Sequence, residues 1–277
     1  MAPSRRLMFC CLLLIAASLL VSLLGLGNGL VPLSIEQVVS ALLGDAPRNV
    51  SMVVTEWRLP RVLMALLIGA GLGVSGAIFQ SLMRNPLGSP DVMGFNTGAW
   101  SGVLVAMVMF GQNLTAIALA AMLGGVLTSL VVWLLAWRNG IDTFRLIIIG
   151  IGVRALLARR MRLLEMGDDT ACALGVRVER SRLLLMLVAV LLTASATALA
   201  GPISFVALVA PHIARRISGT ARWGLTQSAL CGALLLALAD YCAQRLFMPY
   251  QLPVGVVTVS LGGIYLIALL IQESRKK

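Results

Sequence analysis

Long apolar runs separated by short polar or basic connections extend along almost the whole chain. Several runs approach the roughly 20 residues that a helix needs to cross a hydrocarbon core about 30 Å thick. A membrane β-barrel would instead show alternating segments of about ten residues, so helices are predicted. The predicted fold class is all-α, a polytopic membrane helical bundle of about 8 membrane-spanning or half-spanning helices plus one short stub. The apolar segments are 7–26, 62–83, 92–110, 114–137, 146–158 (the stub), 183–200, 203–214, 225–247 and 254–272.

The composition agrees with lipid as the main solvent. The 277 residues are 59% hydrophobic and 12% charged, with a mean hydropathy of +0.96, far from the values of a soluble domain. The run 7–26 is too long for the apolar centre of a signal peptide, so it is predicted to be the first membrane helix. The five cysteines include no CxxC pair and are odd in number, which indicates neither a disulfide framework nor a metal site.

The formal charge of +11 is explained by membrane topology. The basic residues lie between the apolar runs and form no single patch with interleaved aromatics, so no nucleic acid is expected as a partner. Lys and Arg favour the cytoplasmic side in short loops. If both termini are cytoplasmic, 17 of the 22 Lys and Arg residues fall on that side and Arg154 lies within an apolar segment. The outward-facing residues are then Arg48, Arg58, Arg61 and Arg245.

The stub at 146–158 is too short to cross the membrane. Its thirteen residues would form a helix only about 20 Å long, against a hydrocarbon core of about 30 Å. It joins two basic loops that both favour the cytoplasm, and a single crossing would invert every later segment. A re-entrant or an interfacial element is therefore expected, and Arg154 argues against deep burial facing lipid.

The glycine-rich segments of this chain do not fit the nucleotide-binding motifs. Residues 71–76 read GLGVSG, but these glycines lie inside an apolar helix, where a dinucleotide fingerprint has no preceding strand. Gly69, Gly73 and Ala77 instead form a small-residue stripe that allows close helix packing in lipid. The sequence contains no phosphate-binding loop of the form GxxxxGK[ST], so the chain is predicted to be no enzyme and to depend on a separate ATPase.

Several motifs resemble one family of transporters. They are WRLPR at 57–61, the link at 80–99, the loop at 164–175, the run at 201–215, the pair Ala239-Asp240, and LPVG at 252–255. At these residues the chain resembles the FecCD-type permeases, which serve importers of siderophores, haem and cobalamin. Two segments resemble especially the ferric enterobactin permeases of enteric bacteria, namely NPLGSPDVMGFNTGAWSG and GPISFVALVAPHIARRISG.

The resemblance implies a BtuC-like permease in the bacterial inner membrane. Residues 1–277 would form its single transmembrane domain. Such a subunit pairs with a homologous permease in the lipid and contacts two cytoplasmic ATPases. It receives a ferric siderophore, here ferric enterobactin, from a periplasmic binding protein. No cofactor is implied. A haem or cobalamin permease is the alternative within the family.

The resemblance implies that the arginines of the RLPR motif, Arg58 and Arg61, contact the binding protein when it docks. Arg245 is a weaker candidate for the same role. Each planar guanidinium can bind a carboxylate through two hydrogen bonds. The alternative is that these arginines anchor the second helix at the membrane interface.

Coupling to the ATPases is implied for a cytoplasmic segment at about 159–182. A short helix between Gly167 and Gly175 is predicted, with acidic residues at its N-terminus, and it would move as a rigid body with the ATPase. An ordinary solvated loop is the alternative. The coupling residues are Leu164, Glu165, Gly167, Asp168, Asp169, Ala173, Leu174 and Gly175.

Polar residues near breaks in the helices are candidates for the translocation path or its gate. Irregular backbone at membrane depth must be buried in protein or line a cavity. Asp240 lies inside an apolar run, where a carboxylate marks a pathway or a partner, and Gln244 and Arg245 are its expected partners. His212, the single histidine, is expected to be an interfacial hydrogen-bonding residue. The candidates are Asn85, Pro86, Asn96, Thr97 and Asp240, with a structural turn as the alternative for the first four and packing polarity for the last.

The chain departs from the family pattern at the stub. Family members carry two full helices where this chain has residues 146–158, so one helix pair is predicted to be missing. The loss of a pair preserves the sidedness of everything downstream. Two rival functions follow, an inactive or assembly-only remnant and, from another class, an ion-coupled secondary transporter.

Overall fold

The computed structural model is helical throughout its described parts, which are residues 5–29, 31–85, 87–90, 95–110, 114–136, 168–201, 203–219, 224–245 and 252–274. No strand occurs within these ranges, which confirms the all-α prediction. The stub at 146–158, with Arg154, lies outside them. The elements are α1 (Arg5–Gly27), α2 (Ile35–Leu43), α3 (Arg48–Ser51), the π-helix η1 (Met52–Arg58), α4 (Leu59–Met83), α5 (Phe95–Phe110), α6 (Leu114–Ala136), α8 (Asp168–Ala173), α9 (Val178–Ala200), α10 (Val206–Ser218), α11 (Leu225–Arg245) and α12 (Val254–Ser274).

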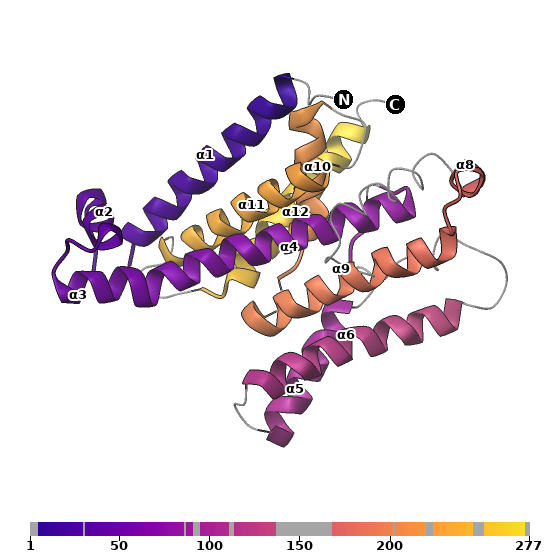
Figure 1. Cartoon of the computed structure of the whole chain (residues 1–277), viewed down its shortest axis with the longest axis horizontal. Helices are drawn as coiled ribbons and strands as arrows, with labels where there is room; N and C mark the ends of the chain where they lie inside the picture. The colour runs from indigo at the N-terminus through magenta and orange to yellow at the C-terminus, as the bar shows by residue number, and fades with distance from the viewer. Residues whose placement is uncertain are drawn as a thin grey trace.

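Helix α4 runs through the middle of the bundle and packs antiparallel against α11 (Figure 1). The two backbones approach so closely that a Cβ at Gly69 would collide with the carbonyl oxygen of Gly232. A Cβ at Gly73 would likewise meet the carbonyl oxygen of Ser228. This close approach confirms that the glycines of α4 serve helix packing, as small residues do between helices in lipid.

Helix α9 packs antiparallel on another face of α4. The hydroxyl of Ser75 donates to the carbonyl oxygen of Ala189 over 3.0 Å and lies 3.0 Å from the hydroxyl of Thr193. Phe79 and Leu185 are both fully buried in the cluster that these helices share. The α5–α6 hairpin lies against α9, on the side away from α1 (Figure 1). Helix α4 thus packs against both α11 and α9, and α9 separates it from the α5–α6 hairpin.

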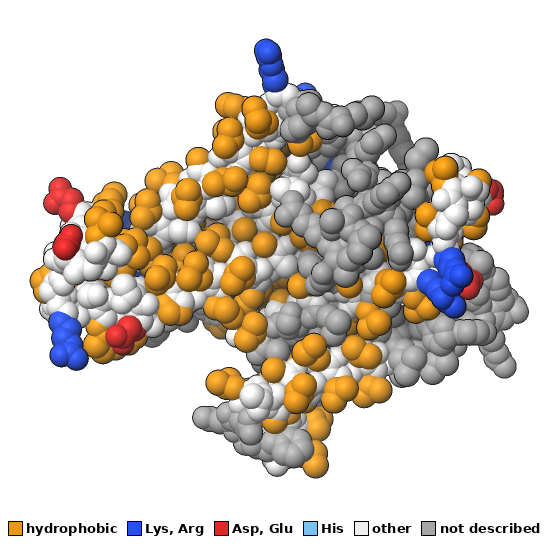
Figure 2. All heavy atoms as spheres, viewed as in Figure 1, with side chains coloured by type: hydrophobic (Ala, Val, Ile, Leu, Met, Phe, Trp, Pro, Cys, Tyr) orange, Lys and Arg blue, Asp and Glu red, His pale blue; other side chains and the backbone are white. Residues whose placement is uncertain are grey.

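The outer surface of the bundle suits lipid. On α1, Phe9 is 66% exposed and Leu19 is 59% exposed. In the view of Figure 2, hydrophobic side chains cover the length of the helices, whereas charged side chains gather near their ends. Three described helical runs are long and apolar enough to cross a membrane, namely Arg5–Gly27, Arg48–Met83 and Leu225–Arg245. Apolar sides with charged ends are expected of membrane-spanning helices.

The described basic connections meet at one end of the bundle. Arg6 donates from Nη2 to the carbonyl oxygen of Ile217 over 3.4 Å, which joins the start of α1 to the end of α10. Arg84, at the end of α4, forms an ion pair with Asp168 at the start of α8. Leu225, at the start of α11, packs against the cluster near the end of α4, so both contacts belong to the same end.

The second membrane helix begins earlier than the sequence predicts. The apolar run suggests a start at residue 62 after an RLPR motif, but one continuous helical run covers Arg48–Met83. The reason is a π-helical turn at Met52–Arg58, closed by the N–H of Leu59, which donates to the carbonyl oxygen of Val54. Pro60 then falls in the first turn of α4, where a missing N–H is tolerated.

Helix α2 is absent from the sequence-based prediction because it is too short to appear as an apolar run. Ser34 and Gln37 form a reciprocal capping box at its start, and Gly44 ends it in a left-handed conformation with φ of 88°. This S-x-x-Q pattern is a local helix signal that hydrophobicity alone overlooks. Figure 1 shows α2 and α3 at the end of α4 opposite to α8.

Candidate functional site

The end of the bundle opposite α8 contains an ion pair between α4 and α11. Arg61 donates from Nε to both carboxylate oxygens of Asp240, over 3.1 and 3.3 Å, and from Nη2 to Oδ1 over 2.9 Å. The Arg61 side chain is 43% exposed, whereas that of Asp240 is only 7% exposed. Gln244, one turn further along α11, donates to Oδ2 of Asp240 over 2.7 Å. A nearly buried carboxylate is thus satisfied from two directions, as burial of a charge requires.

The predicted partners of Asp240 are half right. Gln244 binds the carboxylate as expected, but Arg245 does not. Arg245 turns instead to Tyr241, donating from Nη1 to the phenol oxygen over 2.9 Å, with its guanidinium 6.0 Å from the ring centre. Arg61, which lies on α4, neutralises the Asp240 carboxylate in place of Arg245.

Arg58 fastens the loop that follows α1. Its Nη1 donates to the carbonyl oxygen of Leu26 over 2.8 Å and its Nη2 to that of Val31 over 2.6 Å. Carbonyls at a helix C-terminus lack partners within the helix, and a guanidinium satisfies them well. Gly29 passes directly over Arg58 at φ of 152°, where a Cβ would lie 2.7 Å from Nη2. This geometry favours the anchoring alternative for Arg58, and docking stays a prediction.

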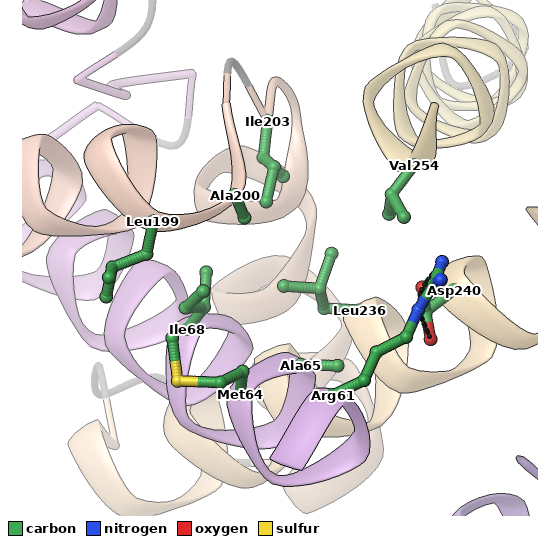
Figure 3. Close-up of a pocket in the computed structure, with 10 residues that line it drawn as sticks. All are labelled: Arg61, Met64, Ala65, Ile68, Leu199, Ala200, Ile203, Leu236, Asp240 and Val254. Atoms are coloured by element: carbon green, nitrogen blue, oxygen red, sulfur yellow. Dashed lines mark hydrogen bonds and ion pairs between the residues drawn. The ribbon is translucent and has the colours of Figure 1, made fainter. Parts of the chain in front are cut away.

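A cavity of about 330 Å³ lies beside the Arg61–Asp240 pair (Figure 3). The close-up shows Arg61 reaching from α4 to Asp240 on α11, with apolar side chains forming the other walls. The cavity therefore combines one ion pair with an apolar lining, a composition typical of binding clefts. Its apolar walls include Met64, Ile68, Leu199, Ile203, Leu236 and Val254.

At the opposite end, α8 is tied to the bundle by its first residue. Asp168 accepts from Nη2 of Arg182 over 2.7 and 2.8 Å and from Nη2 of Arg84 over 3.1 Å. The Arg182 side chain is only 9% exposed, so the carboxylate of Asp168 offsets the cost of burying its charge. Gly175 follows the helix at φ of 78°. The short helix expected between Gly167 and Gly175 is therefore present as α8.

The rest of α8 is open to solvent. Asp169 and Ala173 are exposed, and Leu174 is 58% exposed just after the helix. Ala171 alone points inward and is fully buried. One face of α8 thus contacts the bundle while the other is exposed. Leu164, Glu165 and Gly167 lie outside the described residues.

The remaining path candidates are only partly placed. Asn85 accepts the N–H of Leu87 at its side-chain oxygen over 2.9 Å, which makes it the start of a turn and favours the structural alternative. Asn96 and Thr97 belong to the first turn of α5, but their side chains and Pro86 lie outside the described parts. His212 meets Tyr265 edge-on, with ring centres 6.3 Å apart.

The ion pair between Arg61 and Asp240 is the main feature that sequence reasoning missed. The two residues are 179 positions apart, and each was singled out separately. An arginine at the start of one apolar helix and an acid near the end of another are the available signal, because antiparallel helices bring such positions together.

Comparisons with known proteins agree on one family. The model of the FecCD transport family matches residues 13–158 and 154–272. The chain is 70% identical to the ferric enterobactin transport system permease protein FepG of Escherichia coli K12, with 99% of each chain covered. It is 33% identical to the achromobactin transport system permease protein CbrC of Dickeya dadantii, covering 94% of this chain and 90% of the relative.

A solved structure supports the fold. It is described as an inward-facing conformation of a metal-chelate type ABC transporter, and it matches with a TM-score of 0.77 over 95% of this chain and 98% of its own. Its sequence is 24% identical. The BtuC-like architecture of a helical permease is thereby confirmed.

The same comparisons agree with the prediction of a missing helix pair. The alignment with FepG spans 326 positions, whereas the chain has 277 residues, so at least 49 positions of the alignment have no residue here. Two helices of roughly 20 residues with their connections account for such a length. The two family matches meet at residues 154–158, inside the predicted stub. Despite this shortening, the family match and the identity to FepG show that the chain belongs to the FecCD transport family.

Proposed function

We propose that this chain is the membrane permease subunit of an ATP-driven importer that moves ferric enterobactin across the bacterial inner membrane. The observation that carries the proposal is the 70% identity to FepG over 99% of both chains. The chain itself would perform no chemistry. It would form half of the path, beside a homologous permease, and two cytoplasmic ATPases would supply the energy.

The two ends of the bundle support distinct roles in this assembly. The end with Arg58, Arg61 and Arg245 would face the periplasm and receive the binding protein. The end with α8 would face the cytoplasm, where its exposed surface suits a groove of an ATPase. Both termini would then be cytoplasmic, as the distribution of Lys and Arg favours.

The ion-coupled secondary transporter has less support. Such a mechanism needs acids or histidines in a relay near the middle of the membrane. Within the described residues, the buried acid is Asp240, and it lies at the end of the bundle, paired with Arg61. A paired carboxylate at an interface is poorly placed for a proton relay.

The inactive remnant is the second candidate, and one observation favours it. The alignment with FepG is longer than this chain by about the length of two membrane helices, and such helices would form part of the path. Docking and coupling residues would survive such a loss while transport failed.

Uptake of radiolabelled cargo, with iron as the label in ferric enterobactin and haem and cobalt as the label in cobalamin, tests the proposal. Cells that lack the native permease but retain its partner permease, the ATPase and the binding protein would express this chain, and uptake from ferric enterobactin, haem and cobalamin would be compared. The expected result is uptake of ferric enterobactin alone, abolished when the ATPase is inactivated. Background uptake with the chain present in the membrane at normal abundance would refute transport and favour the remnant.

A companion variant makes the outcome decisive. Inserting the corresponding FepG segment at residues 154–158 restores the missing length. Uptake by the lengthened chain alone would assign the defect to the missing helices. Uptake that persists without any ATPase would refute the ATP-driven mechanism.

A further inference from the structure

The hydrogen bonds of Arg61 leave one side of its guanidinium open. A guanidinium has two edges that can bind a carboxylate, one formed by Nε with one terminal nitrogen and one formed by both terminal nitrogens. Asp240 occupies the first edge, with bonds from Nε and Nη2. Among the described residues, none accepts a hydrogen bond from Nη1 of Arg61, whose bonds come from Nε and Nη2. The second edge is thus available, on a side chain that is 43% exposed.

Asp240 is itself held firmly. Its side chain is 7% exposed, and Gln244 fixes the second carboxylate oxygen over 2.7 Å. The Asp240 carboxylate on α11 therefore holds the Arg61 side chain of α4 in a fixed position. A long arginine held in this way gives up little freedom when it binds a second group.

The two neighbouring arginines are arranged differently. Both terminal nitrogens of Arg58 donate hydrogen bonds to backbone carbonyl oxygens. Arg245 is turned onto Tyr241 at the surface of its own helix. Among the three predicted docking arginines, Arg61 alone is held by a carboxylate that leaves its terminal edge open in the described structure.

We propose that Asp240 is a positioning residue for docking, which holds Arg61 so that its open edge receives a carboxylate of the protein that docks at this end. This inference rests on the proposed function, in which that partner is the periplasmic binding protein. Asp240 touches neither partner nor cargo. It acts through the orientation of Arg61.

Charge alone predicts the opposite result, which makes the proposal testable. Asp240 reduces the positive charge that an acidic partner meets, so by Coulomb attraction the substitution Asp240→Asn would tighten docking. If Asp240 positions Arg61, the substitution weakens docking, because the amide of Asn has one acceptor oxygen where the carboxylate has two and therefore holds Arg61 less firmly. The sign of the change separates the two explanations.

The measurement is the affinity of the binding protein for the whole importer reconstituted in lipid nanodiscs, with ATPase stimulation as a second readout. For Asp240→Asn, affinity about three- to tenfold weaker is expected, in the range for one long side chain that loses its pre-ordering. Gln244→Ala, which keeps the ion pair but frees one oxygen, weakens docking less and serves if Asp240→Asn assembles poorly.

A charge-swapped variant excludes a purely structural role. Arg61→Asp combined with Asp240→Arg restores an ion pair between α4 and α11. If the pair only fastens the helices, this variant recovers both thermal stability and docking. Under the proposal it recovers stability and leaves docking as weak as in Arg61→Ala.

The outcomes distinguish the inference from the function on which it rests. Docking by the unmodified importer together with unchanged or tighter docking by Asp240→Asn overturns the inference alone. Full recovery of docking by the swapped pair also overturns it. An unmodified importer that does not bind the protein removes the docking function itself, and the inference falls with it.

Discussion

Removal of the Asp168 carboxylate is expected to detach α8 from the bundle. The substitution Asp168→Ala breaks the contacts with both Arg84 and Arg182. The pair with Arg84 joins side chains that are 53% and 43% exposed, so it contributes about 0–1 kcal/mol. The contact with Arg182 weighs more because that side chain is 9% exposed, and hydrogen bonds to charged groups contribute about 1.5–3 kcal/mol.

The local free energy of opening of α8 should therefore fall by about 1.5–3 kcal/mol, mostly through Arg182. At 1.4 kcal/mol for each factor of ten, amide hydrogen exchange in α8 would become about 10- to 150-fold faster. Arg84→Ala should change the rate by less than about fivefold. The assay is hydrogen–deuterium exchange with mass spectrometry on the assembled importer, together with the number of ATP molecules hydrolysed per cargo imported.

Asp169→Ala is the matched control. Asp169 is the neighbouring acid in the same first turn and is exposed, so its removal costs only the attraction to the helix N-terminus, about 0.3–1 kcal/mol. The difference between the two variants isolates the arginine contacts. Equal exchange rates in Asp168→Ala and Asp169→Ala would show that the contacts with Arg84 and Arg182 do not hold α8.

Three further outcomes follow from the packing and from the ends of the bundle. Gly76→Ala places a Cβ against the backbone of α10 and should cost about 1–3 kcal/mol in thermal unfolding, whereas Gly71→Ala, which has room, should be neutral or stabilising; equal effects would contradict the close approach. Arg58→Ala removes the donor to the carbonyl oxygens of Leu26, in the last turn of α1, and of Val31, and should cost about 1–3 kcal/mol by the same measurement, more than Arg48→Ala at an exposed position; a smaller loss than for Arg48→Ala would be evidence against anchoring. Cys172 is exposed on α8, so a membrane-impermeant maleimide should label it in inside-out vesicles only, and labelling in intact spheroplasts would reverse the proposed orientation.

The sequence predicts the long helices well because lipid imposes a strong and local signal. An apolar run of about 20 residues has few alternatives to a helix in hydrocarbon. The ends of α6, α9 and α11 accordingly lie within a few residues of the predicted limits. Short helices lack this signal. Helix α2 begins at a capping box, and the π-helical turn at Met52–Arg58, which precedes Pro60, has no hydrophobic pattern that predicts it.

Candidate residues were easier to select than to pair. Gln244 was a correct partner for Asp240 because residues four positions apart share one face of a helix. Arg61 was not recognised as a partner because its contact with Asp240 depends on the register between α4 and α11. That register is set by the backbone contacts of Gly69 and Gly73, and a single sequence does not reveal which helix those glycines meet.

Helix α4 links the two ends that the proposed function requires. It carries Arg61 at one end and Arg84 at the other, 23 residues apart, which corresponds to about 35 Å along a helix. Asp240 of α11 binds the first arginine, and Asp168 of α8 binds the second. Both contacts lie outside the stub where the family match breaks. The residues proposed for docking and coupling are therefore separate in sequence from the break in the family match.

This separation predicts how the shortened chain differs from its lengthened variant. Insertion of the FepG segment at residues 154–158 should leave the affinity for the binding protein within about twofold if docking depends on α4 and α11 alone, since mutations at sites that share no partners act nearly independently. Uptake should change, because the inserted helices would contribute to the wall of the path. If the insertion altered docking as strongly as uptake, the missing helices would have to support the α4–α11 frame, and docking and transport would depend on the same part of the protein.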